Sequence, residues 1–319
     1  MNRETRLPTN RTDLATAIKS EAARLGFDLC GITDARPSDF RTEYKQWLDN
    51  GFHGEMGYLA RDPNRRTDPN LVFPSAKSII SVAMNYYTES DADKAAPDEA
   101  IFARYARNED YHDVMTPRLR ELLNWIIANT DPGTEGKVYV DTGPLLEREI
   151  ARRAGLGWFG KNSMLINTKR GSYFLLGEII LNIELPPDKP AIGGCGTCTK
   201  CLDACPTQAI VAPYVVDSRR CISYLTIELK GDIPEEFNGK IGNRIFGCDI
   251  CQDVCPFNER RATPTTEPAF QPRTATTRPK LADLLEMTEE EFREKFRKSP
   301  VKRTKLQGMK RNVEVGAWE

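Results

Sequence analysis

The chain has little histidine, no long apolar run and almost no net charge. Of its two histidines, His112 lies in a polar and aromatic run at the start of a predicted helix, where a structural role is favoured over metal ligation. No stretch of about 18 apolar residues occurs, so no membrane-spanning helix is expected. The formal net charge of −1 gives no general attraction to nucleic acid or membranes. Nucleic acid or a membrane would therefore have to bind a local cluster of basic residues.

The N-terminus also lacks an export signal. The charged residues within Met1 to Pro8 are not followed by an apolar core, so neither a secretory nor a twin-arginine signal is expected. The sequence therefore predicts a cytoplasmic protein. Disulfides do not persist in that reducing compartment, and nine cysteines there indicate metal ligands with one to spare. Cys30, isolated between apolar residues, is the spare one and is more typical of a small buried hydrophobe.

Two nucleotide-binding signatures are missing as well. The chain has no P-loop, and Gly155-Leu-Gly157 does not continue into the dinucleotide-binding fingerprint. These glycines could still let the backbone approach a flat cofactor, with Trp158 and Phe159 supplying apolar contact.

The cysteines that are present are concentrated in one segment. Eight of the nine lie between Cys195 and Cys255. The segment opens with a C-x2-C-x2-C-x3-C-P run that ends at Pro206, and it closes with a C-x2-C-x3-C-P run from Cys248 to Pro256. In two-cluster ferredoxins, three closely spaced cysteines ligate one cluster, and the fourth, followed by proline, ligates the other. The pattern therefore predicts two [4Fe–4S] clusters.

The second run lacks its first cysteine, because Ile245 stands where it would fall, and Cys221 is the remaining candidate. The ferredoxin crossing pattern then predicts two ligand sets. They are Cys195, Cys198, Cys201 and Cys255 for the first cluster, and Cys205, Cys221, Cys248 and Cys251 for the second. Zinc and disulfides are the alternatives. A zinc site does not usually need the third cysteine or the final proline, so iron–sulfur clusters are favoured.

Hydrophobic periodicity predicts alternating helices and strands before the cysteine segment. Helices are predicted over 13–25, 116–129 and 145–154, and strands over 27–32, 77–85, 137–140 and 173–183. The strand 77–85 is almost wholly apolar, which is typical of the middle of a sheet. A proline-rich linker follows at 186–190. The predicted organisation is an α/β domain over 1–188, a ferredoxin-like domain over 189–270 and a basic helical segment over 271–319.

Asp141 is the candidate proton donor. It follows the strand 137–140, at a position where α/β folds place their ligand crevices. A carboxyl group in an apolar pocket covered by a cofactor has a raised pKa and can donate a proton at neutral pH. Alternatively, Asp141 caps the helix that begins near Pro144. The spacing leaves both interpretations open.

The C-terminal part is strongly basic. Nine lysines and arginines and one acid, Glu294, lie between Arg293 and Arg311. Such a run can contact phosphates, or it can be a solvated helix face. Before it, Thr288 and Glu291 form a capping-box pattern that predicts a helix over 289–298.

Several motifs together resemble the epoxyqueuosine reductase family, and the likeness covers nearly the whole chain. The motifs are Gly31-Ile, Arg104-Tyr-Ala with Asp110-Tyr-His, Val140-Asp-Thr-Gly-Pro144, Gly155-Leu-Gly-Trp-Phe-Gly-Lys-Asn162, the displaced double-cluster pattern and Ser299-Pro-Val-Lys-Arg303. The resemblance implies an α/β (α+β), nitroreductase-like and reductive-dehalogenase-like domain that binds base-off cobalamin. A bacterial-ferredoxin-like double [4Fe–4S] domain is expected to follow it.

The resemblance also implies an activity and partners. The expected reaction is the two-electron removal of the epoxide oxygen from epoxyqueuosine at the tRNA wobble position, which gives queuosine. Electrons are expected to pass from a low-potential donor protein through the clusters to cobalamin, while Asp141 supplies a proton. A monomer without membrane contact is expected.

Site residues follow from the same resemblance. The expected cobalamin neighbours are Arg66, Arg104, Asp141, Trp158, Leu165, Thr168, Ile222 and Ser223. The expected tRNA contacts are Lys302, Arg303, Lys305, Lys310 and Arg311. The cluster that includes Cys221 is expected to lie nearer the cobalt, because Ile222 and Ser223 follow that cysteine directly.

Two other functions remain possible at this point. A corrinoid reductive dehalogenase would share the cofactor and both clusters, but such enzymes typically carry an export signal and a tyrosine proton donor. A ferredoxin-like electron carrier fused to a binding domain would need neither an acid nor a deep pocket.

Overall fold

The computed structural model describes residues 10–316, and the expected absence of an export signal concerns residues outside this range. The largest sheet has the strand order β1-β2-β7-β4, and each neighbouring pair is antiparallel. Its strands are β1 (Leu29–Asp34), β2 (Ser78–Asn85), β4 (Gly136–Tyr139) and β7 (Phe174–Leu181). All eight residues of β2 are buried, and β2 lies between β1 and β7, so its predicted place inside the sheet is confirmed.

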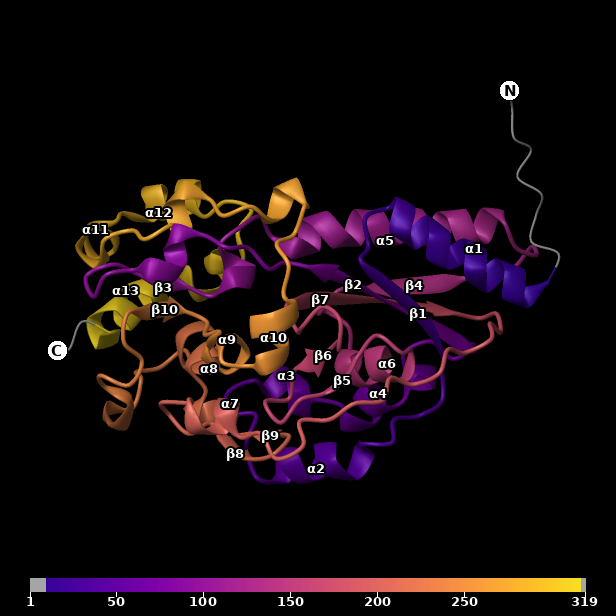
Figure 1. The fold of residues 1–319 in the computed structure, drawn as a ribbon, viewed down its shortest axis with the longest axis horizontal. Helices are drawn as coiled ribbons and strands as arrows, with labels where there is room; N and C mark the ends of the chain where they lie inside the picture. Colours follow the sequence, from indigo (N-terminus) through magenta and orange to yellow (C-terminus); the bar gives the residue numbers. More distant parts are fainter. Residues whose placement is uncertain (1–9, 317–319) are drawn as a thin grey trace.

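Helices cover both faces of this sheet (Figure 1). On one face, α1 (Arg11–Arg24) and α5 (Tyr111–Ala128) bury their apolar residues against the strands in the main hydrophobic core. On the other face, α6 (Glu147–Arg153) packs against β2 and β7. Gly31 of β1 lies where the end of α6 approaches the sheet, and a side chain there would collide with the carbonyl of Ala154. None of the helices within residues 10–316 has the length and apolar character needed to cross a membrane.

Capping residues explain where the predicted helices begin. The Asn10 side chain accepts hydrogen bonds from two backbone amides of α1. Asp110 caps α5 in the same way, so this helix begins at Tyr111, five residues before its predicted start. Near the C-terminus, the predicted capping box of Thr288 and Glu291 is present.

The remaining elements are short. The further strands pair as β3 (Ile101–Phe102) with β10 (Arg244–Phe246), β5 (Trp158–Phe159) with β6 (Leu165–Ile166), and β8 (Ile210–Ala212) with β9 (Val215–Val216). The further α-helices are α2 (Arg41–Asp49), α3 (Gly57–Ala60), α4 (Pro63–Thr67), α7 (Lys200–Asp203), α8 (Ile222–Ile227), α9 (Ile250–Asp253), α10 (Pro256–Arg261), α11 (Leu281–Glu286), α12 (Glu289–Lys295) and α13 (Lys305–Gly316). The 3₁₀-helices are η1 (Pro69–Leu71), η2 (Asp91–Lys94), η3 (Arg104–Ala106), η4 (Ser218–Arg220), η5 (Glu235–Phe237), η6 (Pro268–Phe270), η7 (Thr274–Thr276) and η8 (Pro300–Thr304).

The C-terminal helices form a second core with segments from far earlier in the chain. Residues of α11, α12 and α13 share one hydrophobic cluster with Phe102, Ala106 and Phe246. The irregular stretch 262–278 is anchored in the main core by Phe270, which is fully buried. Packing therefore crosses all three predicted segments of the chain.

Candidate active site and cluster ligands

Three closely spaced cysteines and a fourth that is distant in sequence line one cavity. Cys195, Cys198 and Cys201 lie before and within α7, whereas Cys255 immediately precedes α10. They are the whole of the first predicted ligand set. Four thiols on the wall of one cavity fit the donor requirement of a [4Fe–4S] cluster.

The second predicted set also comes together. Burial raises the pKa of Cys251, and the charges of Cys248 and Cys221 raise it further. Burial likewise raises the pKa of Cys221, with a smaller contribution from the charge of Cys205. Thiols influence one another's ionisation in this way only when they lie close together. The displaced Cys221 is therefore near the cysteines that it was predicted to join.

The glycine-rich loop 155–162 lies against both cysteine sets. The backbone amide of Lys161 donates to Cys195 Sγ at 3.4 Å, and its ammonium group donates to two carbonyls of the same cysteine loop. The side chain of Asn162 donates to the carbonyl of Cys251 at 3.0 Å. Hydrogen bonds to cluster sulfurs influence the reduction potential. This loop therefore belongs to the surroundings of the clusters.

Three expected cobalamin neighbours make their contacts with residues other than Asp141. Trp158 is buried and packs edge-on against Phe257 of α10, with 5.2 Å between ring centroids. Leu165 is buried in a small hydrophobic cluster, and Thr168 is exposed in the turn after β6. Within residues 10–316, no hydrogen bond or ion pair joins any of the three to Asp141.

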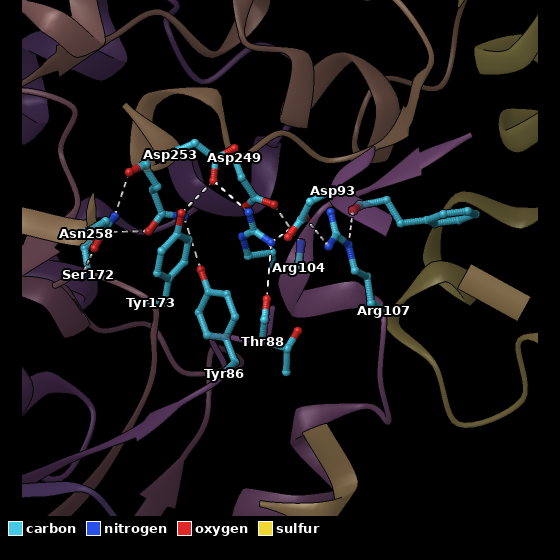
Figure 2. Close-up of polar contacts among 12 residues, drawn as sticks. Tyr86, Thr88, Asp93, Arg104, Arg107, Ser172, Tyr173, Asp249, Asp253 and Asn258 are labelled. Atoms are coloured by element: carbon cyan, nitrogen blue, oxygen red, sulfur yellow. Dashed lines mark hydrogen bonds and ion pairs between the residues drawn. The ribbon is translucent and has the colours of Figure 1, made fainter. Parts of the chain in front are cut away.

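Arg104 is the centre of a buried polar network (Figure 2). Its side chain is 10% exposed and pairs with Asp93 at 2.5 Å and with Asp253 at 3.2 Å. The rings of Tyr87 and Tyr173 both lie near the guanidinium, at 5.3 and 5.6 Å. Arg104 was expected beside cobalamin, but in the structure its guanidinium is already bound to two carboxylates.

This network holds α9, the short helix between cluster cysteines. The backbone amide of Arg104 donates to Asp249 at 2.7 Å, and the hydroxyl of Tyr173 donates to Asp253 at 2.6 Å (Figure 2). Burial raises the pKa of Asp249 to about 6, and the charge of Asp253 adds to this effect. Because Asp249 lies between Cys248 and Cys251, these contacts fix the backbone that carries two predicted ligands.

Removal of the Arg104 side chain is expected to destabilise the protein. Arg104→Ala leaves Asp93 with Arg107 as its cation but takes the cation from Asp253, and the loss of charged hydrogen bonds inside the network costs about 2 kcal/mol. The matched control is Arg36→Ala, because its pair with Asp39 is about half exposed on both sides and is worth less than about 1 kcal/mol. Urea unfolding measures both free energies. If Arg104→Ala and Arg36→Ala lower the free energy of unfolding equally, the network has no central role in stability.

Asp141 lies in the turn after β4 and has a left-handed backbone, with φ of 57°. The hydroxyl of Tyr111 donates to Asp141 Oδ2 at 2.9 Å, and the Asp141 amide donates to Glu147 Oε1 at 2.7 Å. The capping alternative is wrong, because the N-cap of α6 is Leu146 and no side chain caps this helix. The exposed carboxyl of Asp141 is therefore available to a bound molecule.

Polar side chains from four parts of the chain surround Asp141. Burial raises the pKa of Tyr105 far above its usual value, and the charge of Asp141 contributes further. Burial raises the pKa of Tyr58, with smaller contributions from Glu228 and Asp141. Arg303 pairs with Glu228 at 2.8 Å. We name these residues the Asp141 group: Tyr58, Tyr105, Tyr111, Asp141, Glu228 and Arg303.

Helix α8 connects the second cysteine set with the Asp141 group. Cys221 is its N-cap and Glu228 is its C-cap. The six residues of α8 span about 9 Å at the usual helical rise. Ile222 and Ser223, both expected beside cobalamin, form its first turn. Arg66, the remaining expected neighbour, donates to the carbonyls of Gly143 and Tyr58 at 3.4 and 3.5 Å, beside the Asp141 turn.

The predicted tRNA-contacting residues divide into two kinds. Lys302 and Arg303 are about half exposed and pair with Asp110 and Glu228, so Arg303 is part of the Asp141 group and Lys302 precedes it directly in the chain. Lys305 is exposed, and Lys310 is half-buried. The guanidinium of Arg311 instead donates to the carbonyls of Leu225, Leu229 and Gly231. A structural role therefore accounts for its contacts.

Comparison with known proteins decides the family. Residues 66–142 match the family model described as "Epoxyqueuosine reductase QueG, DUF1730". The chain is 44% identical to the epoxyqueuosine reductase of Cellulophaga algicola, over 93% of this chain and 96% of that protein. The chain belongs to the epoxyqueuosine reductase family. It is also 42% identical to the Escherichia coli epoxyqueuosine reductase, over 97% of this chain and 82% of that protein. It is therefore an oxidoreductase.

Solved structures of epoxyqueuosine reductases confirm the predicted fold. One contains a tRNA-Tyr epoxyqueuosine-modified stem loop and aligns with a TM-score of 0.89 and 37% identity, over 96% of this chain and 81% of that one. Another, from Bacillus subtilis, has its catalytic aspartate loop swung out of the active site. It aligns with a TM-score of 0.89 and 35% identity, over 96% of this chain and 82% of that one.

The cysteine segment is confirmed as an iron–sulfur region. Residues 194–258 match the family model described as "4Fe-4S double cluster binding domain". Zinc and disulfides, the two alternatives for these cysteines, are therefore set aside. The assignment of each cysteine to a cluster remains a prediction that the geometry of both sets supports.

Sequence reasoning missed several residues near Asp141. Tyr105 and Tyr111 stood in the polar and aromatic run 104–112, but nothing in that run indicated that they would face Asp141. Glu178 had a clearer signal, because it is the only acid in the apolar strand β7. A lone acid in such a strand indicates a buried polar contact.

Proposed function

We propose that this chain removes the epoxide oxygen of epoxyqueuosine in tRNA and so forms queuosine. The epoxide takes up two electrons and two protons, both carbon–oxygen bonds break, and the products are an alkene and water. The two clusters that the eight cysteines would hold would supply electrons one at a time. Asp141 supplies a proton to the oxygen as negative charge develops on it.

The observation that carries this proposal is the environment of Asp141. Its carboxyl is exposed, yet its turn is held by Tyr111 and Glu147. Two further tyrosines and Arg303 surround it, so hydrogen-bond donors converge where an oxygen would become negative. An electron carrier would need none of these groups.

The side chains near Asp141 offer the hydrogen-bond donors and apolar contacts that cobalamin requires. Its rim carries amides and a phosphate, and Arg66 can donate to such groups because its present hydrogen bonds are long. Ile222 and Ser223 offer apolar and hydroxyl contacts on the side of the second cluster. When bound, cobalamin supplies a low-valent cobalt centre that delivers the electron pair. Asp141 and the tyrosines orient the epoxide and move the proton.

One reaction tests the proposal. Cluster-replete protein is incubated without oxygen with cobalamin, a low-potential electron donor and tRNA that contains epoxyqueuosine, and the nucleosides are then analysed by mass spectrometry. We expect queuosine to form only when all components are present. The absence of queuosine with intact clusters and bound cobalamin would contradict the proposal.

The basic C-terminal residues are proposed to contact the phosphates of the anticodon stem-loop. Replacement of both Lys305 and Lys310 by alanine is expected to weaken stem-loop binding. It should also reduce the slope of log K against log salt by about 0.9 for each lost phosphate contact. Fluorescence anisotropy at several salt concentrations measures both quantities.

The control for this experiment is Lys45→Ala. Lys45 is exposed on α2, which lies at the bottom of the view, apart from α13 at the left (Figure 1). An unchanged slope in the double variant, or the same change in the control, would exclude this surface as the phosphate-binding one.

A further inference from the structure

Glu178 is a fully buried acid in the middle of the main sheet. It lies in β7, is 0% exposed, and is in register with Ser81 of β2 and Tyr139 of β4. Within residues 10–316, no donor makes a hydrogen bond of standard geometry to either of its carboxyl oxygens. An ionised carboxylate would therefore be buried without a donor, and this position favours a neutral acid.

The side chain that faces Glu178 is another acid, Glu147, at the start of α6. This helix packs over β2 and β7, and the carboxyl groups of Glu147 and Glu178 lie within hydrogen-bonding reach of each other. Two carboxyl groups can hydrogen bond only when one of them carries a proton. Burial raises the pKa of both, that of Glu147 to about 7, where the charge of Asp141 contributes as well. The two acids therefore share a single proton near neutral pH.

Glu147 also holds the turn that carries Asp141. Its Oε1 accepts the amide of Asp141 at 2.7 Å, while the carboxyl of Asp141 accepts from Tyr111. A left-handed backbone at a residue other than glycine is unfavourable and persists only when surrounding contacts impose it. The hydrogen bond to Glu147 is one of the two contacts that do so.

We propose that Glu147 and Glu178 form a proton-dependent latch that positions Asp141. With one proton between the two acids, Glu147 stays where it accepts the Asp141 amide. When both ionise, repulsion moves Glu147 away and the turn is released. In the Bacillus subtilis relative the catalytic aspartate loop is seen swung out of the active site. The relevance of the latch to turnover depends on the proposed function, because that function makes Asp141 the proton donor.

The surroundings of the latch define its pH dependence. The charged or titratable groups that face it are Asp141 in the turn after β4, Arg148 on α6 and Tyr111 on α5, and Tyr139 of β4 lies beside Glu178 in the sheet. From β2 it meets only the neutral hydroxyl of Ser81. Because folding raises both pKa values, the pair loses its first proton near pH 7 and its second proton only at higher pH, where both acids are ionised and the latch opens.

Hydrogen exchange in the holoenzyme tests the latch without requiring turnover. In the unmodified protein, protection of the amides in 140–147, corrected for intrinsic exchange, should fall about tenfold per pH unit above the midpoint. Glu178→Gln should abolish this fall, because the amide can donate to Glu147 without a titrating proton. If Glu178→Gln does not fold, Glu147→Gln replaces it, and this variant should likewise show no fall in protection with pH.

Two further variants separate the latch from general effects. Glu149→Gln is the matched control, since Glu149 is a buried acid of α6 that accepts the amide of Asp39 instead, and it should keep the pH dependence. Glu147→Ala should expose the turn at every pH. Amide protection in 140–147 that does not depend on pH in the unmodified protein would overturn the latch. The same fall in protection in Glu178→Gln as in Glu149→Gln would also overturn it. If the exchange results hold while no queuosine forms, only the proposed function fails.

Discussion

Asp141→Asn is expected to lower the rate of queuosine formation by about 10² to 10⁴, the range that general acid catalysis contributes. Asparagine has the same shape and can still accept the hydrogen bond from Tyr111, so the turn should keep its conformation. It cannot deliver a proton to the leaving oxygen. Single-turnover rates with reduced enzyme and modified stem-loop measure the effect.

The controls for this variant concern cofactors and charge. Iron content should not change, because Asp141 belongs to neither cysteine set, and the visible spectrum serves to verify that cobalamin is still bound. Asp113→Asn removes one negative charge from an exposed position in the first turn of α5 and should leave the rate unchanged. Full turnover by Asp141→Asn with bound cobalamin would exclude Asp141 as the proton donor.

Cys221→Ala is expected to remove the second cluster and to abolish turnover. Alanine has no thiolate, and a [4Fe–4S] cluster held by three cysteines loses one of its four bonds to the protein. The first cluster should remain, because its four cysteines line a separate cavity. Iron analysis should therefore find half of the iron, and electron paramagnetic resonance of the reduced protein should show one cluster in place of two.

The matched control for Cys221→Ala is Cys30→Ala. Cys30 is half-buried beside the main core and lies outside the cysteine segment, so its replacement should leave the iron content unchanged. Full iron in Cys221→Ala would show that another residue is the displaced ligand. Loss of all iron would show that the two clusters assemble together.

Much of the main sheet was predictable because its signals are local. The strand 77–85 is mostly apolar, and the helix 116–129 shows a regular apolar face, so hydrophobic burial dictates where both must lie. The start of α5 was placed too late, because Asp110 and Tyr111 carry little apolar periodicity. Their position depends on a cap and on a contact with Asp141, which lies thirty residues further on.

The candidate site was predictable only in part. Asp141 was found from its place at the end of a strand, but its partners come from four distant segments. Arg104 and Arg311 share motifs or charge with functional residues, yet their guanidinium groups are bound to carboxylates and to backbone carbonyls. A basic side chain in a sequence does not show whether its partner is a ligand or its own chain.

The sequence by itself determined the chemistry of the cysteine segment. Spacing of two and three residues sets which thiols can reach one cluster, and the missing cysteine at Ile245 pointed to Cys221. Only the tertiary structure decided what surrounds Asp141 and what lies beneath it. The pairing of Glu147 with Glu178 depends on the docking of α6 onto the sheet. That contact arises from long-range packing, which leaves no periodic signal in the chain.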